Sequence, residues 1–117
     1  MAARNSDIHR LRIYMNIKIA IEEIIKSTIP DSVNGIPIRT DLREVKSDFY
    51  HDSKDFNLTL MPESSDCENV AISLRICPDQ FPVDTQKGSL AYDRLEYSIG
   101  DLLISYIQNI IRRTSNE

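Results

Sequence analysis

Apolar residues recur at helical spacing in two long segments, one near each end of the chain. From about Ser6 to Thr28 and again from about Ser89 to Arg113, they return every three or four residues, which is the period of an amphipathic helix. Pro30 follows the first segment and ends it, because a proline ring cannot continue a helix. The expected core faces are Ile13, Tyr14, Ile17, Ala20, Ile21, Ile24 and Ile25 in the first helix, and Tyr92, Leu95, Ile99, Leu102, Leu103, Tyr106 and Ile110 in the second.

The segment between these helices alternates apolar and polar residues, as half-buried strands do. Strict alternation runs through residues 56–60, and residues 70–77 place Val70, Ile72, Leu74 and Ile76 on one face. A charged, roughly alternating stretch from Thr40 to Tyr50 comes earlier, after a turn predicted at Asn34-Gly35. Since consecutive strands with short connections usually pair, we expect an α+β fold of order α-β-β-β-α, with a small antiparallel sheet of three or four strands packed against two long terminal helices.

The length predicts one domain that spans residues 1–117. No run of 18 apolar residues is present to cross a bilayer, and the start, MAARNSDIHR, is polar and lacks the apolar segment of a secretory signal. We therefore expect a cytoplasmic protein with no membrane partner.

The charge of the chain is weakly acidic and unevenly distributed. The net charge is -4, and residues 41–68 hold eight acidic residues against three basic ones. A general nucleic-acid binder usually carries a basic surface, so nucleic acid is not the expected partner. The acidic stretch is either a set of solvated loops or a surface for a basic protein.

The two cysteines, Cys67 and Cys77, stand at the two ends of the last predicted strand. At about 3.3 Å per residue they lie roughly 30 Å apart, whereas a disulfide needs Cα atoms about 4.4–6.8 Å apart. The same distance excludes a shared metal. We expect two ordinary cysteines, and neither a metal nor a cofactor.

A group of acidic residues with one histidine precedes the second predicted strand. It consists of Asp48, His51, Asp52 and Asp55. These residue types can bind a divalent cation, but the group lacks the residue order and the bidentate Glu of a calcium loop. We interpret it as a hydrated hairpin tip.

The segment PDSVNGIPIRTDLREVK, residues 30–46, contains Pro-Asp, then Asn-Gly, then Glu-x-Lys. In these features it resembles the metal-dependent nucleases of the restriction-endonuclease superfamily. The resemblance implies that Asp31 and Glu44 would hold Mg²⁺ and that Lys46 would assist the attacking water. The segment departs from that pattern, since only two residues separate Asp31 from the turn and IRTDLRE lacks the apolar run of a buried catalytic strand.

Both helices carry more apolar residues than their core faces contain. These are Ile8, Leu11, Met15 and Ile19 in the first helix, and Ile104, Ile107 and Ile111 in the second. The two helices could bury them against each other and against the sheet. Because contiguous exposed apolar patches are uncommon on monomers, we instead expect these seven residues to form an interface.

The helices therefore suggest a function in assembly. We expect a non-catalytic protein–protein interaction or assembly subunit, homo-oligomeric through its helix faces, for example a structural component of a phage tail or neck. One alternative is a small acidic inhibitor, such as an immunity or antitoxin protein, that covers a basic target with residues 41–68. A weaker alternative is the Mg²⁺-dependent nuclease that uses Asp31, Glu44 and Lys46.

Overall fold

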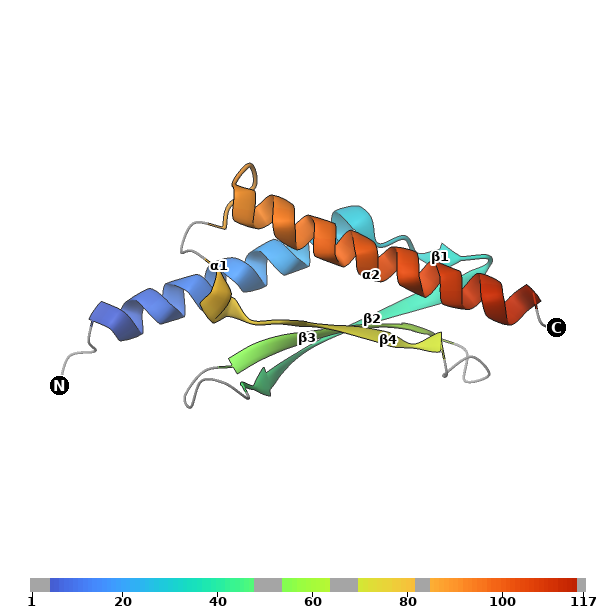
Figure 1. The fold of residues 1–117 in the computed structure, drawn as a ribbon, viewed down its shortest axis with the longest axis horizontal. Coiled ribbons are helices and arrows are strands. Elements are labelled where there is room, and N and C mark those ends of the chain that lie inside the picture. The colour runs from blue at the N-terminus through green and yellow to red at the C-terminus, as the bar shows by residue number, and fades with distance from the viewer. Residues whose placement is uncertain (1–4, 48–53, 64–69, 82–84, 116–117) are drawn as a thin grey trace.

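The computed structural model describes residues 5–47, 54–63, 70–81 and 85–115. In chain order these form the elements α1 (Asn5–Thr28), β1 (Ser32–Val33), β2 (Ile36–Lys46), β3 (Lys54–Pro62), β4 (Ile72–Ile76), the short 3-10 helix η2 (Pro78–Gln80) and α2 (Leu90–Ser115). The order α-β-β-β-β-α confirms the predicted α+β fold, with two long helices at the ends of the chain (Figure 1).

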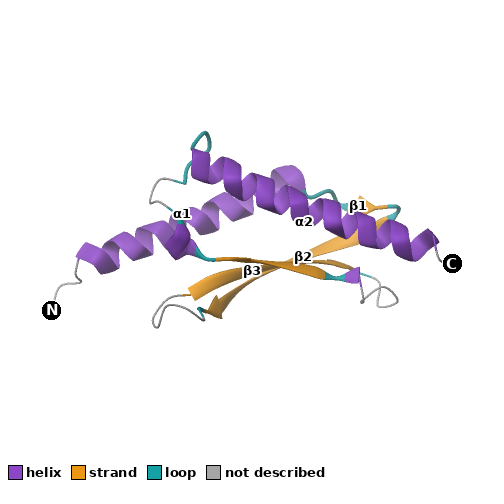
Figure 2. Ribbon diagram, in the orientation of Figure 1, coloured by secondary structure: helices purple, strands orange, loops and turns teal. Residues whose placement is uncertain are grey.

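The four strands form one antiparallel meander in the order β1-β2-β3-β4 (Figure 2). The longest pairing joins β2 to β3 and runs from Ile38 opposite Pro62 to Lys46 opposite Lys54. Strand β4 pairs with the other side of β3, with Phe56 opposite Ile76. The charged stretch that was expected to form a strand and the alternating residues 56–60 therefore pair as a hairpin, β2 with β3.

Strand β2 begins at Ile36, four residues before the stretch that the sequence suggested. The cause is the turn at Asn34-Gly35, where φ is +51° and +78°. Two successive residues with positive φ make the tight turn whose twist suits a hairpin, so the chain pairs with itself immediately on both sides. Residues 48–50, the expected end of this strand, lie outside the described residues.

Both helices cover the same face of the sheet, and the other face is uncovered (Figure 1). Phe56, Leu58 and Leu60 of β3 are fully buried beneath the helices. The ring of Tyr14 in α1 stacks on Phe56, with ring centroids 4.7 Å apart. The predicted core faces of both helices are buried or packed against the core.

Side-chain hydrogen bonds cap the start of α2 and link it to α1. The Ser89 hydroxyl accepts a hydrogen bond from the backbone N–H of Tyr92 at 3.1 Å and so caps the first turn of α2. The Tyr92 hydroxyl donates to Oε2 of Glu23 in α1 at 3.3 Å. Burial, together with the negative charge of Glu23, raises the pKa of Tyr92.

The molecule is elongated. Its extents are 61 × 29 × 18 Å and its radius of gyration is 16.3 Å, whereas a compact chain of this length has a radius of about 13 Å. The first turns of α1 and the last turns of α2 project at opposite ends of the molecule (Figure 1). Of the described helices, none combines the length and the apolar character needed to span a bilayer.

Candidate interaction surface on the helices

Large apolar side chains are exposed on the helices. Among the described residues seven are exposed, with relative exposures between 48% and 82%. They are Leu11, Met15 and Ile19 in α1, and Leu90, Tyr97, Ile104 and Ile111 in α2. The apolar surface that remains in water is therefore concentrated on α1 and α2.

Five of the seven residues predicted as an interface are in this exposed set. Ile107 is half-buried, and Ile8 lies within α1 but its side chain is outside the described part of the chain. Sequence reasoning missed Leu90 and Tyr97. The available signal was their spacing, since each stands seven or fourteen residues before Ile104.

The four exposed apolar residues of α2 form a line along the helix. They stand at intervals of seven residues, and we call Leu90, Tyr97, Ile104 and Ile111 the outer stripe. With about 100° of rotation per residue, the outer stripe occupies an arc of about 60° on the side of α2 opposite its core face. The sheet therefore cannot bury it.

The exposed apolar residues of α1 also lie on the side of the helix opposite its core face. Leu11, Met15 and Ile19 stand four residues apart, and we call them the α1 patch. They lie opposite the core face, which includes the fully buried Ile17 and Ile24. Leu11 and Met15 lie in the N-terminal half of α1, and Ile19 lies just past its middle.

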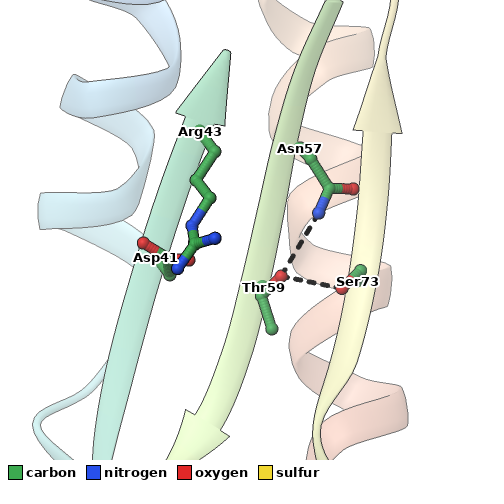
Figure 3. Close-up of polar contacts among 5 residues, drawn as sticks. All are labelled: Asp41, Arg43, Asn57, Thr59 and Ser73. Atoms are coloured by element: carbon green, nitrogen blue, oxygen red, sulfur yellow. Dashed lines mark hydrogen bonds and ion pairs between the residues drawn. The ribbon is translucent and has the colours of Figure 1, made fainter. Parts of the chain in front are cut away.

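The uncovered face of the sheet carries several polar side chains that bond to one another. Figure 3 shows Asp41 paired with Arg43 at 2.7 Å and a chain of hydrogen bonds in which Asn57 donates to Thr59, which shares a bond of 2.7 Å with Ser73. These side chains stand at alternate positions of β2, β3 and β4 and point away from the core. None of the described strand residues on this face is an exposed large apolar side chain.

Acidic residues in the described part of 41–68 are mostly paired with basic ones. Asp41 pairs with Arg43, and the buried Asp55 pairs with Arg75 at 3.0 Å. Glu44 lies between two lysines, with Lys54 at 3.8 Å and Lys18 at 3.9 Å. Local pairing reduces the field that these residues offer to a basic partner. The other acidic residues of the segment, except the exposed Glu63, lie outside the described residues.

An open groove of about 470 Å³ runs between α1 and β2. Ile25, Leu42 and Phe56 form its apolar lining, and its charged lining consists of Lys18, Glu22, Lys26 and Glu44. The pKa of Glu44 is lowered, first because the Tyr14 hydroxyl can donate to its carboxylate and then because of the charges of Lys54 and Lys18. Burial and the nearby Glu44 raise the pKa of Tyr14. The two signs of charge balance in the groove, so it selects no particular ligand charge.

The residues of the nuclease resemblance do not meet. The Asp31 carbonyl accepts a hydrogen bond of 2.9 Å from the N–H of Ile38, which places Asp31 six strand residues, or about 20 Å, from Glu44. Among the described residues, no three His, Cys, Asp or Glu side chains are grouped as metal ligands. Cys77 is half-buried and forms no disulfide with another described residue. Cys67, Asp48, His51 and Asp52 lie outside the described residues.

Comparison of the chain with protein-family models, with curated proteins and with solved structures finds no match.

Proposed function

We propose that the protein is a non-catalytic assembly subunit of the cytoplasm that associates with further copies of itself through the outer faces of its helices. One observation supports the proposal above the others. The seven exposed large apolar side chains of the described residues all lie on α1 and α2, on the sides turned away from the core. Exposed apolar groups gathered in this way are typical of protein–protein contacts.

The size of the apolar surface indicates the strength of association. Each side chain of the outer stripe is half to four-fifths exposed, so its burial contributes about 1–2 kcal/mol. Eight such side chains in a pair of subunits give about 8–16 kcal/mol, against a cost of association of about 4–15 kcal/mol. Because the two ranges overlap, we expect weak and reversible association.

The test is the molar mass of the purified protein, measured by sedimentation velocity and light scattering from about 1 μM to about 1 mM. We expect the mass to rise with concentration above that of the 13.5 kDa chain. The double variant Ile104→Glu/Ile111→Glu should remain monomeric, because association would bury its charges. The matched control is Ala71→Glu, which adds a charge at an exposed position outside the helices. A strict monomer at the highest concentration would contradict the proposal.

A further inference from the structure

We propose that self-association takes the form of an antiparallel pair, in which α2 packs along α2 of a second copy with Gly100 at the centre of the contact. This inference rests on the proposed function and specifies its geometry. Three independent features of α2 carry it: the spacing of the outer stripe, the surroundings of Gly100 and the distribution of charge along the helix.

The spacing of the outer stripe indicates that the partner surface is a helix. Leu90, Tyr97, Ile104 and Ile111 repeat every seven residues over 21 residues, a length of about 32 Å. A seven-residue repeat drifts slowly around a straight helix, and it stays in contact when two helices wind gently around each other. Only part of the outer stripe would contact a flat partner surface.

Gly100 supports a close approach of the second helix. It lies within α2, three residues after Tyr97 and four before Ile104, and so borders the outer stripe. A Cβ built at Gly100 meets nothing within 4 Å. Glycine destabilises a helix interior, and packing within one chain gives no reason for it at this position. The close approach of the backbone of a second helix would require a glycine at this position.

Charge along α2 favours the antiparallel direction. Residues 90–101 carry three acidic residues and one basic one, whereas residues 102–115 carry two basic residues and no acidic one. Asp93 and Glu96 lie toward one end of α2, and Arg112 and Arg113 lie toward the other. Asp101 lies near the middle of the helix and favours neither direction. The single basic residue of the first half, Arg94, lies over the ring of Phe81 in its own chain at 5.8 Å. Antiparallel helices bring the acidic half of each copy beside the basic half of the other, and parallel helices bring like charges together.

The outer stripe then fixes the register. A two-fold axis between residues 100 and 101 places Leu90 opposite Ile111 of the second copy and Tyr97 opposite Ile104 of the second copy. Every side chain of the outer stripe is covered in this arrangement. A shift by one seven-residue step would leave an unmatched apolar side chain at one end of each helix.

The first experiment tests direction and register by disulfide cross-linking. Single variants Tyr97→Cys and Ile104→Cys are prepared in a chain whose native cysteines are replaced, Cys67→Ser/Cys77→Ser, and are mixed and mildly oxidised at a concentration where the unaltered protein associates. We expect the mixed 97–104 product to exceed each of the 97–97 and 104–104 products by at least tenfold. A parallel pair would instead give the two like-with-like products. Ser73→Cys, on the uncovered sheet face, is the control and should give no rapid cross-link.

The second experiment replaces Gly100. The replacements should stabilise the monomer and weaken the association of two subunits. Gly100→Ala and Gly100→Gln should raise the melting temperature of the dilute monomer, since the new side chain meets open space and favours the helix. Both should weaken association, Gly100→Gln by at least tenfold in dissociation constant. If Gly100→Gln associates normally while Ile104→Glu/Ile111→Glu does not, the antiparallel contact at Gly100 is wrong and the proposed function stands. If the unaltered protein never associates, both fail.

Discussion

At the scale of single residues, the two ion pairs of the uncovered sheet face differ in burial. The carboxylate of Asp55 is almost fully buried and is paired with Arg75, which also donates to the backbone carbonyl of Lys46 at 2.6 Å. Asp41 and Arg43 form a shorter contact, but the Arg43 side chain is 70% exposed. Exposed pairs contribute little, whereas a buried carboxylate that loses its partner is strongly destabilising.

We therefore expect Arg75→Gln to lower the free energy of unfolding by about 2 kcal/mol, because Asp55 keeps its buried charge and loses the guanidinium. The Arg75 side chain is 42% exposed, so the expected loss of stability is smaller than for a fully buried ion pair. Urea unfolding at neutral pH measures the change. Arg43→Gln is the matched control and should change stability by less than about 0.5 kcal/mol. Equal effects of the two variants would contradict this account of burial.

A second residue-scale prediction concerns the Tyr14 hydroxyl. Because that hydroxyl is the leading cause of the lowered Glu44 pKa, Tyr14→Phe should move the Glu44 pKa back toward its ordinary value of 4.5. The stacking on Phe56 is kept, since phenylalanine has the same ring. A carboxyl-detected NMR titration measures the shift. An unchanged Glu44 pKa in the variant would mean that Lys54 and Lys18 alone are responsible.

The same group gives a pH dependence of folding. A carboxyl whose pKa is depressed in the folded state stabilises the fold fully above its unfolded pKa, and that contribution disappears as the pH falls through the folded value. Urea unfolding between about pH 6 and pH 3 should therefore show a smaller loss of stability on acidification in Tyr14→Phe than in the unaltered protein. The direction of this difference is the tested quantity.

At the scale of elements, the start of α2 depends on one hydroxyl. Ser89→Ala removes the acceptor for the Tyr92 N–H and should lower the free energy of unfolding by about 1 kcal/mol. Ser89→Asp keeps an acceptor and adds a negative charge at the helix N-terminus, so its stability should equal or exceed that of serine. Thermal unfolding followed by circular dichroism compares the two. A loss in Ser89→Asp as large as in Ser89→Ala would contradict a capping role.

The elements show which parts of the fold were predictable. Ile17, Ile21 and Ile24 repeat with the helix period over about two turns, so the core face of α1 could be predicted from the sequence. Strand β1 has only two residues, which pair locally across the Asn34-Gly35 turn, so it is too short to show an alternating pattern. Leu90 and Tyr97 lie on the same side of α2 as Ile104 and Ile111. They were missed because the polar residues around them hide their seven-residue spacing.

At the scale of the whole molecule, the proposed association is mainly apolar and should depend weakly on salt. Between about 0.05 and 0.5 M NaCl we expect the dissociation constant to change by less than about tenfold, since charge pairs at the edge of the contact are screened but the outer stripe is not. Sedimentation equilibrium across this range is the measurement. A weakening of more than a hundredfold would mean that charge dominates, as in an acidic inhibitor that uses residues 41–68.

The edges of the sheet bear on how such a protein avoids misassembly. β1 pairs only with Ile36 and Pro37, so one edge of the sheet consists mainly of β2, which carries charged residues at 39, 41, 43, 44 and 46. The other edge is β4, with five residues that include the charged Arg75. Charged side chains along an edge disfavour pairing with an incoming strand, which is one way in which natural sheets resist amyloid-like growth. Subunits that associate through their helices would thus be brought close together without forming fibrils through their strands.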